Sequence, residues 1–182
     1  QLIAEIRRLQ CTIDQHSDSS AAANYACIKY WQASRNNTAI RSWLGNAPRP
    51  EQAFNHIDQA HNRNLARAYT ELGELQNARK LLEKNSDDAR QCDLPIETNR
   101  NLILLAGVAA QQKHAADAKA YLLQAIELSL QTGLSSSFVR KKSMLKTVYQ
   151  KIQQDPALLP PVKEKLASLL CLSGINLHTP AA

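Results

Sequence analysis

Apolar residues recur at spacings of three and four along most of the chain. The segment after residue 74 shows this well, because Leu75, Ala78, Leu82 and Ala89 fall on one side of a helix. The same periodicity predicts a helix, or two short ones, over about residues 51–72. It predicts further helices over about residues 1–15, 20–34, 37–44, 75–92, 95–112, 115–131, 137–153 and 162–172.

Short breaks separate these segments. Gly45 and Gly133 each follow a helical pattern, and a glycine just past the last turn commonly ends a helix. Gly73 interrupts the pattern again, and Pro95 suits the first turn of a new helix. Helices of this length with short connections pack antiparallel to their neighbours, so the sequence predicts an all-α fold.

The helical pattern also repeats, with a period near 40 residues. Shifting residues 65–82 by 40 places small residues on small ones and large apolar residues on large ones, and a shift of 39 toward the N-terminus gives a weaker match. The stronger matches are Leu65 with Leu105, Ala66 with Ala106, Ala78 with Ala118 and Leu82 with Leu122; the weaker ones are Tyr69 with Tyr30, Ala78 with Ala39 and Leu82 with Trp43. Stacked helix pairs can bury apolar faces that a single pair cannot.

The central unit resembles the tetratricopeptide repeat (TPR), although a period near 40 is longer than the ~34 residues of that repeat. The resemblance rests on Leu65, Ala66, Tyr69, Gly73, Leu75, Ala78 and Leu82. We therefore expect a TPR-like α-solenoid of about 8–9 helices over residues 1–172. Residues 173–182 are expected to form a tail or linker. Because the chain starts at Gln1 rather than Met, we also expect it to be a piece of a longer protein.

Composition and charge narrow the class of protein. The 182 residues carry 22 basic and 16 acidic side chains, a formal charge of +6 that allows an acidic partner without requiring one. The four cysteines form no Cys-x-x-Cys motif, which fits reduced thiols in the cytoplasm. No signal peptide and no apolar run near the ~20 residues of a membrane span are present, so we expect no membrane contact.

Candidate catalytic and metal groups are weak. His56 and His61 are five residues apart, a poor spacing for one helical face, and we expect the histidines to face solvent. The serines at 135–137 lack a glycine elbow and suit a helix cap, and the adjacent Asp87 and Asp88 do not face each other on a helix. We expect no metal site, no cofactor in this part of the chain and no enzymatic activity.

The concave face of such an array, formed by the first helix of each pair, is the expected binding surface. The TPR pattern places eight residues there: Asn24, Trp31, Gln32, Arg63, Arg67, Glu71, Arg100 and Gln111. These polar groups with one large aromatic could bind a small polar effector or a peptide, or they could be ordinary surface residues. Tyr30, Trp43, Tyr69 and Leu82 are expected to pack in the core.

Arg140, Lys141, Lys142, Lys146 and Lys151 form a separate basic cluster. Its spacing fits a contact with DNA phosphates or an acidic protein. A solvated helical face is the favoured interpretation, because no stacking aromatics are interleaved beyond Tyr149.

A more specific resemblance appears when the units are read in order. The stretch from Asn64 to Leu75, continued through Leu81-Leu82-Glu83, resembles the penultimate repeat of MalT-type activators, which are large ATP-binding regulators of the LuxR family. The later apolar and Ala-rich helices, then Gly133, Phe138 and Val139, and the earlier Trp43-Leu44 also resemble that family. In this chain Arg140-Lys141-Lys142 stand where the family usually has Asp-Glu-Gly, so any family contact through those acidic residues is not carried over.

The resemblance implies a sensor domain between two other modules. ATP is expected only in a missing N-terminal module, and DNA contact only through a missing C-terminal helix-turn-helix. In agreement, the chain has no phosphate-binding Gly-x-x-x-x-Gly-Lys-Ser/Thr loop and no recognition-helix pattern after Leu172. The sequence thus favours a non-catalytic, effector-sensing and self-associating domain. A general protein-binding scaffold is the alternative.

Overall fold

The computed structural model describes residues 18–139 and 142–174, which form nine helices and no strand. The predicted all-α fold is confirmed. The predicted helix over residues 1–15 lies outside the described residues, as does most of the predicted tail. The chain divides into two compact units, Gln1–Leu94 and Pro95–Ala182. None of the described helices is both long and apolar enough to cross a membrane.

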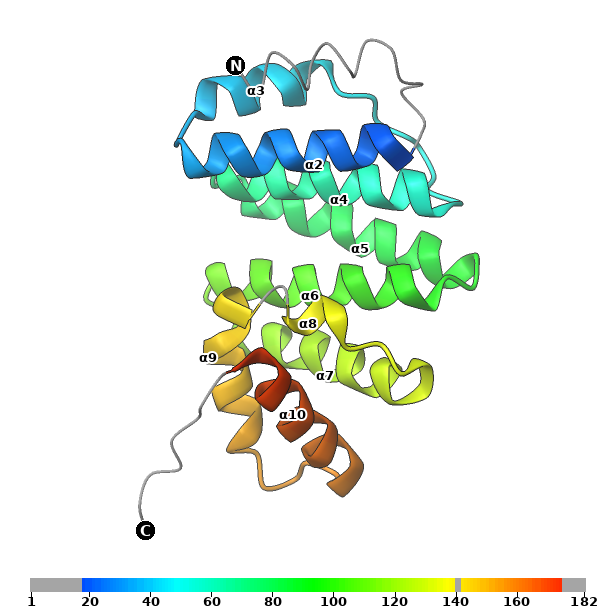
Figure 1. The fold of residues 1–182 in the computed structure, drawn as a ribbon, viewed down its shortest axis with the longest axis vertical. Coiled ribbons are helices and arrows are strands. Elements are labelled where there is room, and N and C mark those ends of the chain that lie inside the picture. The colour runs from blue at the N-terminus through cyan, green and yellow to red at the C-terminus, as the bar shows by residue number, and fades with distance from the viewer. Residues whose placement is uncertain (1–17, 140–141, 175–182) are drawn as a thin grey trace. The chain divides into compact units, whose positions relative to one another are not determined.

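The first unit is a stack of helices in which α4 contacts α2, α3 and α5 (Figure 1). Its helices are α2 (Asp18–Ala33), α3 (Asn37–Asn46), α4 (His56–Glu71) and α5 (Leu75–Gln91). Apolar side chains of the first three meet in one core, made of Cys27, Ile28, Trp31, Ile40, Leu44, Leu65 and Ala68. Burial of this core holds the stack together, because isolated helices about as long as the 16-residue α2 and α4 are only marginally stable in water.

The second unit is built on a close helix pair, and α9 crosses this pair steeply (Figure 1). Its helices are α6 (Pro95–Gln111), α7 (Ala115–Thr132), α8 (Ser136–Val139), α9 (Lys142–Gln153) and α10 (Pro160–Ser173). Helix α7 contacts both α9 and α10. The single helix predicted over residues 137–153 is therefore present as the short α8 and the longer α9, and residues 140–141 between them are not described.

The period of 40 residues is confirmed by burial and by one polar contact. The paired residues Leu82 and Leu122 are both inaccessible to solvent, as are Ala78 and Ala118. Each helix pair is also tied by a buried side-chain amide on its first helix. Gln59 Nε2 donates to the Asn85 carbonyl at 2.9 Å, and Asn99 Nδ2, 40 residues later, donates to the Ala125 carbonyl at 2.8 Å.

Four helix ends share one backbone conformation at intervals of 20 residues. Gly73, Asp93, Lys113 and Gly133 all have positive φ angles, of 78°, 51°, 64° and 74°. After each of the first three, the next amide donates to a carbonyl five residues back; Glu74 N to Tyr69 O, for example, measures 2.9 Å. This left-handed turn closes a helix and satisfies its last carbonyls. One such turn at the end of each helix gives the 20-residue spacing, which is half of the 40-residue repeat.

Two predicted helix boundaries are wrong. Gly45 does not end its helix: α3 continues to Asn46, and Ala47, in an extended conformation, caps it. The helix predicted from residue 51 begins at His56, because Asn55 accepts hydrogen bonds from the Ile57 and Asp58 amides at 2.9 and 3.0 Å. Such a side-chain cap satisfies amides that the first turn leaves free.

Alanine substitutions at Gly73 and Gly45 should have opposite effects on the free energy of unfolding. We expect Gly73→Ala to lower the free energy of unfolding by about 1–2 kcal/mol, because a Cβ strains the left-handed conformation. Gly45→Ala should raise it by about 0.5–1 kcal/mol, because that residue is helical, exposed and has no atom within 4 Å of an added Cβ. Urea titration followed by circular dichroism measures both. Changes of the same sign would contradict this account.

A polar contact joins α7 to the turn before α10. Lys119 Nζ forms an ion pair with Asp155, and the Ala157 amide donates to the same carboxylate at 3.0 Å. The hydrogen bond from Lys119, and then that from Ala157, hold the pKa of Asp155 below its ordinary value of 3.8. A carboxylate with a lowered folded-state pKa stabilises the fold fully above 3.8, and the contribution is lost as the pH falls through the lowered pKa.

The pH dependence of stability should therefore report this contact. We expect Lys119→Met to reduce stability at neutral pH and to flatten its decline below pH 3.8, since its hydrogen bond is the main cause of the lowered pKa. Lys163→Met is the control, because Lys163 has the weakest influence on Asp155. Melting temperatures from pH 7 to pH 2.5 give the comparison. An equal fall in melting temperature below pH 3.8 in wild type and Lys119→Met would contradict this account.

Candidate functional site

The eight residues predicted to line a groove fall in both units. Six lie on the first helices of the first unit, Asn24, Trp31 and Gln32 on α2 and Arg63, Arg67 and Glu71 on α4; Arg100 and Gln111 lie on α6. Arg100 and Gln111 are exposed, and Arg100 pairs with Glu97 at 2.8 Å. The group on α2 and α4 belongs to the first unit, and these two helices contact each other.

On that surface Arg67 is the best-defined predicted residue. Its guanidinium lies 4.8 Å from the centre of the Tyr25 ring, a cation–π geometry, and its Nη1 donates to Asn64 Oδ1 at 2.8 Å. Asn24 accepts a hydrogen bond from the Trp43 indole at 3.1 Å. The sequence pattern missed Tyr25, whose spacing alone gives no sign that it pairs with a cation on α4.

Two of the predicted groove residues are buried. Trp31 is 4% exposed and packs in the core, and Arg63 is also 4% exposed. The expectation that the Trp31 ring lies open for stacking is wrong. Its neighbour Tyr30, expected in the core, is 48% exposed. Adjacent helical residues differ by about 100° around the axis, so an error of one residue in the TPR register exchanges the two roles.

The histidines are not all solvent-facing. His56 and His114 are exposed, as expected, whereas His61 is 8% exposed and its Nε2 lies 2.6 Å from the Pro48 carbonyl. Because a carbonyl only accepts, His61 donates from Nε2 there. His16 and His178 lie outside the described residues. Within residues 18–139 and 142–174 no cluster of three or more His, Cys, Asp or Glu could hold a metal ion.

The basic cluster is only partly described. Lys146 and Lys151 are exposed on α9. Arg140 and Lys141 lie outside the described residues, and the side chain of Lys142 is not described either. A contact of this cluster with DNA or protein therefore stays a prediction.

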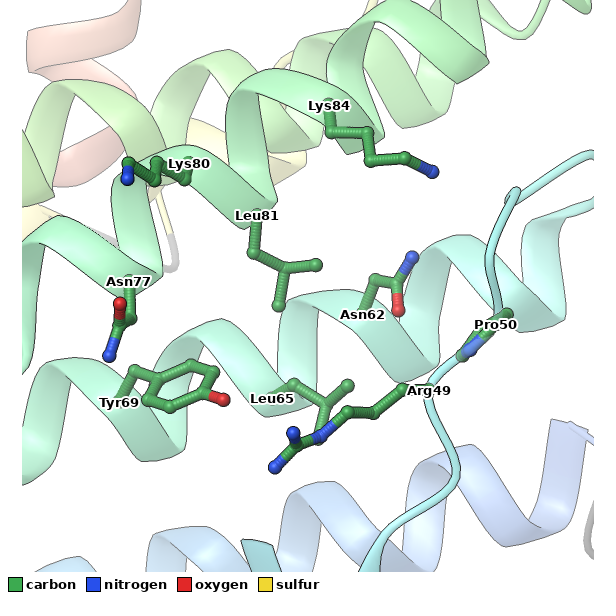
Figure 2. A pocket seen from close by; sticks show the side chains of 9 residues that line it. All are labelled: Arg49, Pro50, Asn62, Leu65, Tyr69, Asn77, Lys80, Leu81 and Lys84. Atoms are coloured by element: carbon green, nitrogen blue, oxygen red, sulfur yellow. The ribbon is translucent and has the colours of Figure 1, made fainter.

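A cavity of about 360 Å³ opens between α4 and α5 in the first unit (Figure 2). Its apolar lining comes from Leu65, Tyr69 and Leu81, and its charged lining from side chains of α5 and of the loop before α4. The complete set is Arg49, Pro50, Asn62, Leu65, Tyr69, Asn77, Lys80, Leu81 and Lys84. No acidic side chain lines this cavity, so its charged groups are all cationic.

The three cations differ in how they are held. Lys84 Nζ contacts the Glu51 carbonyl and lies 3.4 Å from the Asp88 carboxylate. Arg49 Nη2 donates to the Leu44 carbonyl at 3.3 Å. Lys80 is exposed and has no hydrogen bond or ion pair with any described residue. Lys80 is therefore the cation most available to a ligand.

A buried amide network fixes the polar end of the cavity. Asn85 Nδ2 donates to the Gln59 carbonyl at 3.2 Å, so Asn85 Oδ1 is left to accept. Asn62 Nδ2 donates to this oxygen at 3.1 Å. The orientation of the Asn62 amide is thereby set, because a flipped amide would bring two oxygens together.

This orientation leaves one acceptor unused. Asn62 is 2% exposed, and its Oδ1 is buried with no hydrogen-bond partner among the described residues. In Figure 2 the amide nitrogen of Asn62 turns toward α5 and the oxygen turns to the side on which Arg49 lies. Buried oxygens without partners are uncommon and costly, so the Asn62–Asn85 contact has to offset this cost.

None of the nine cavity residues belongs to the predicted groove set. One sequence signal was available: Asn77, Lys80, Leu81 and Lys84 follow helical spacing and form a stripe along one side of α5. The partners of this stripe on α4 and before it are up to 35 residues away in sequence, and no local pattern joins them.

Comparison with known proteins places this fold in a family. The family described as "MalT-like TPR region" matches residues 1–155. The HTH-type transcriptional regulator MalT of Vibrio campbellii is 36% identical over 152 residues, which is 84% of this chain and 17% of that protein. MalT of Vibrio parahaemolyticus is 39% identical over 76% of this chain and 15% of its own length, and MalT of Klebsiella pneumoniae is 35% identical over 90% and 18%.

The chain spans less than a fifth of the length of these regulators. The match covers the repeat units and both helix pairs in which the 40-residue period was found. The resemblance read from the sequence is thus confirmed, and the chain belongs to the MalT-like TPR region family.

Proposed function

We propose that this chain is the effector-binding and protein-interaction domain of a MalT-like transcriptional regulator and that it has no catalytic activity of its own. The observation that carries the proposal is the cavity of about 360 Å³ between α4 and α5. Small-molecule sites measure about 300–1,000 Å³ and combine an apolar lining with a few polar groups. A ligand that prefers one conformation of the parent protein would shift the population toward it.

The polar surface of α2 and α4 is the second part of the proposal. Asn24, Gln32, Arg67 and Glu71 remain candidates there, because each is at least partly exposed. Arg100 and Gln111 remain candidates on α6 for the same reason. Exposed arginines and amides suit hydrogen bonds to a polar effector or to a peptide backbone.

We also propose that this domain is one module of a longer regulator. We propose that ATP binds in a separate N-terminal module, that DNA is read by a C-terminal helix-turn-helix, and that the protein works in the cytoplasm. The relatives support this, since they are helix-turn-helix transcriptional regulators many times longer than the matched region. Self-association of the repeat domain is part of the same proposal.

A general protein-binding scaffold without a small ligand is the second candidate. One observation favours it: Tyr25 and Tyr30 are 37% and 48% exposed on α2. Tyrosine is enriched at the centre of protein interfaces, where its ring packs and its hydroxyl bonds.

A thermal-shift screen against sugars, organic acids, phosphorylated metabolites and aromatic compounds tests the proposal. A ligand of the folded state at a hundred times its dissociation constant adds about 2.7 kcal/mol, which raises melting by several degrees. Any reproducible hit supports an effector-binding domain. Arg67→Ala, compared with the exposed Arg90→Ala, reports whether the α2–α4 surface takes part. No hit in any class would favour the scaffold.

A further inference from the structure

The cavity between α4 and α5 holds its charged groups around an apolar centre. Its cations are Arg49, Lys80 and Lys84, and its apolar lining includes Tyr69 and Leu81. In Figure 2 the ammonium groups of Lys80 and Lys84 point in opposite directions, and Leu81 lies between them and points toward α4. A compact anion can meet only one of these two lysines, so a ligand that meets both has to be extended.

We infer that this cavity binds an extended acidic segment of a partner protein, with one apolar side chain between two carboxylates. The inference rests on the protein-interaction part of the proposed function and names the chemistry of the partner. Successive side chains of an extended segment point to opposite sides, so every second one faces the same surface, at intervals of about 6.6 Å. The expected pattern is therefore Asp or Glu, any residue, an apolar residue, any residue, and Asp or Glu.

The positions of the two lysines fit this pattern. Lys80 and Lys84 are one helical turn apart on α5, so their Cα atoms are separated by about 6 Å along the helix axis. Because the two side chains diverge, their ammonium groups lie farther apart than that (Figure 2). The outer two carboxylates of the expected pattern are about 13 Å apart in an extended segment. The apolar residue midway between them then faces Leu81.

Both lysines can receive a carboxylate. Lys80 is exposed and has no hydrogen bond or ion pair with any described residue. Lys84 is also exposed, contacts the Glu51 carbonyl and lies 3.4 Å from the Asp88 carboxylate. Because a lysine has three donors, Lys84 can bind a further carboxylate beside these two partners.

Two acidic side chains bond to residues that line the cavity, and both have further partners. Asp88 is 7% exposed and accepts a hydrogen bond from the Ala53 amide at 3.0 Å in addition to its lysine. Glu74 accepts a hydrogen bond from Asn77 at 3.0 Å and pairs with Arg41 at 3.4 Å. The lining itself thus keeps an excess of positive charge, which complements an acidic segment.

The apolar centre of the cavity can take one side chain from the partner. Tyr69 and Leu81 are half-buried, so part of each can still be covered, whereas Leu65 is 2% exposed and closes the floor. Covering these side chains with a leucine removes apolar surface from water on both sides of the contact. This contribution does not depend on salt, in contrast to that of the carboxylates.

The test uses a synthetic peptide with glutamate, leucine and glutamate at its second, fourth and sixth positions and serine at the other four. Acetylation and amidation remove the charges of its ends. Nuclear magnetic resonance titration of the full chain measures the affinity and locates the shifted residues. We expect shifts on α4 and α5, and binding about tenfold or more tighter than that of a peptide with lysine in place of both glutamates. Serine in place of the leucine should weaken binding by about threefold or more.

Lys80→Glu should weaken binding of the glutamate peptide by about tenfold or more, because an attraction becomes a repulsion. Lys151→Glu is the matched control: it changes the net charge equally at an exposed lysine of α9 that does not line the cavity. We expect it to weaken binding by less than about twofold. Both lysines are exposed, so both variants should stay folded.

Equal losses in Lys80→Glu and Lys151→Glu would overturn the inference, because they would report net charge alone. Equal affinities for the glutamate and lysine peptides, or shifts confined to other helices, would overturn it as well. A small-molecule hit in the thermal-shift screen that Lys80→Glu leaves unchanged, together with no binding of the glutamate peptide, would overturn the inference and leave the proposed function standing.

Discussion

Leu122→Ala is expected to lower the free energy of unfolding by about 2–5 kcal/mol, the range for removing a buried leucine side chain. Leu122 is completely buried on α7, one turn after the equally buried Ala118. The loss combines the removed apolar area with the cavity that remains, because a helix held by neighbours on several sides collapses little. Urea titration followed by circular dichroism at 222 nm measures the change.

Leu130→Ala on the same helix is the matched control. Its side chain is 42% exposed, so we expect a loss below about 1 kcal/mol. Leu82→Ala, at the equivalent position of the first unit, should cost as much as Leu122→Ala, since Leu82 is buried to the same degree. Similar small losses for Leu122→Ala and Leu130→Ala would mean that the 40-residue period does not mark the packing positions.

The 40-residue repeat could be predicted from the sequence because its signals are local. A small residue and a large apolar residue one turn later, as at Ala78 and Leu82, depend only on helical geometry and not on which helix lies opposite. Most helix bounds followed from the same periodicity. The error at Gly45 arose because a glycine marks a helix end only where its φ is positive, which composition alone does not specify.

The candidate site was much harder to predict from the sequence. The roles of Tyr30 and Trp31 were exchanged because both are large aromatics next to each other, and only the packing of α2 decides which one is buried. The cavity depends on Asn62 and its partner Asn85, two polar residues that are buried on facing helices. A prediction based on hydrophobicity assigns such polar residues to the surface. The two residues are also 23 positions apart, so their contact leaves no periodic signal in the sequence.

The Asn62–Asn85 pair should contribute strongly to the stability of the fold. We expect Asn85→Ala to lower the free energy of unfolding by about 2–4 kcal/mol. The substitution removes the acceptor of the Asn62 amide at 3.1 Å and the donor to the Gln59 carbonyl at 3.2 Å. The buried Asn62 amide nitrogen left without its acceptor costs about 1–3 kcal/mol, and the missing side chain leaves a small void. Asn77→Ala on the same helix is the control, because its only described hydrogen bond is an exposed one to Glu74.

A double-mutant cycle separates the pair from its surroundings. If the two amides act as a unit, Asn62→Ala/Asn85→Ala should lose less stability than the two single variants added together, since the second change removes a group already orphaned by the first. The coupling should reach about 0.5–3 kcal/mol, as expected for residues in one hydrogen-bond network. Additive losses would show that the network does not hold Asn62 in place. The orientation of the Asn62 amide would then need another cause.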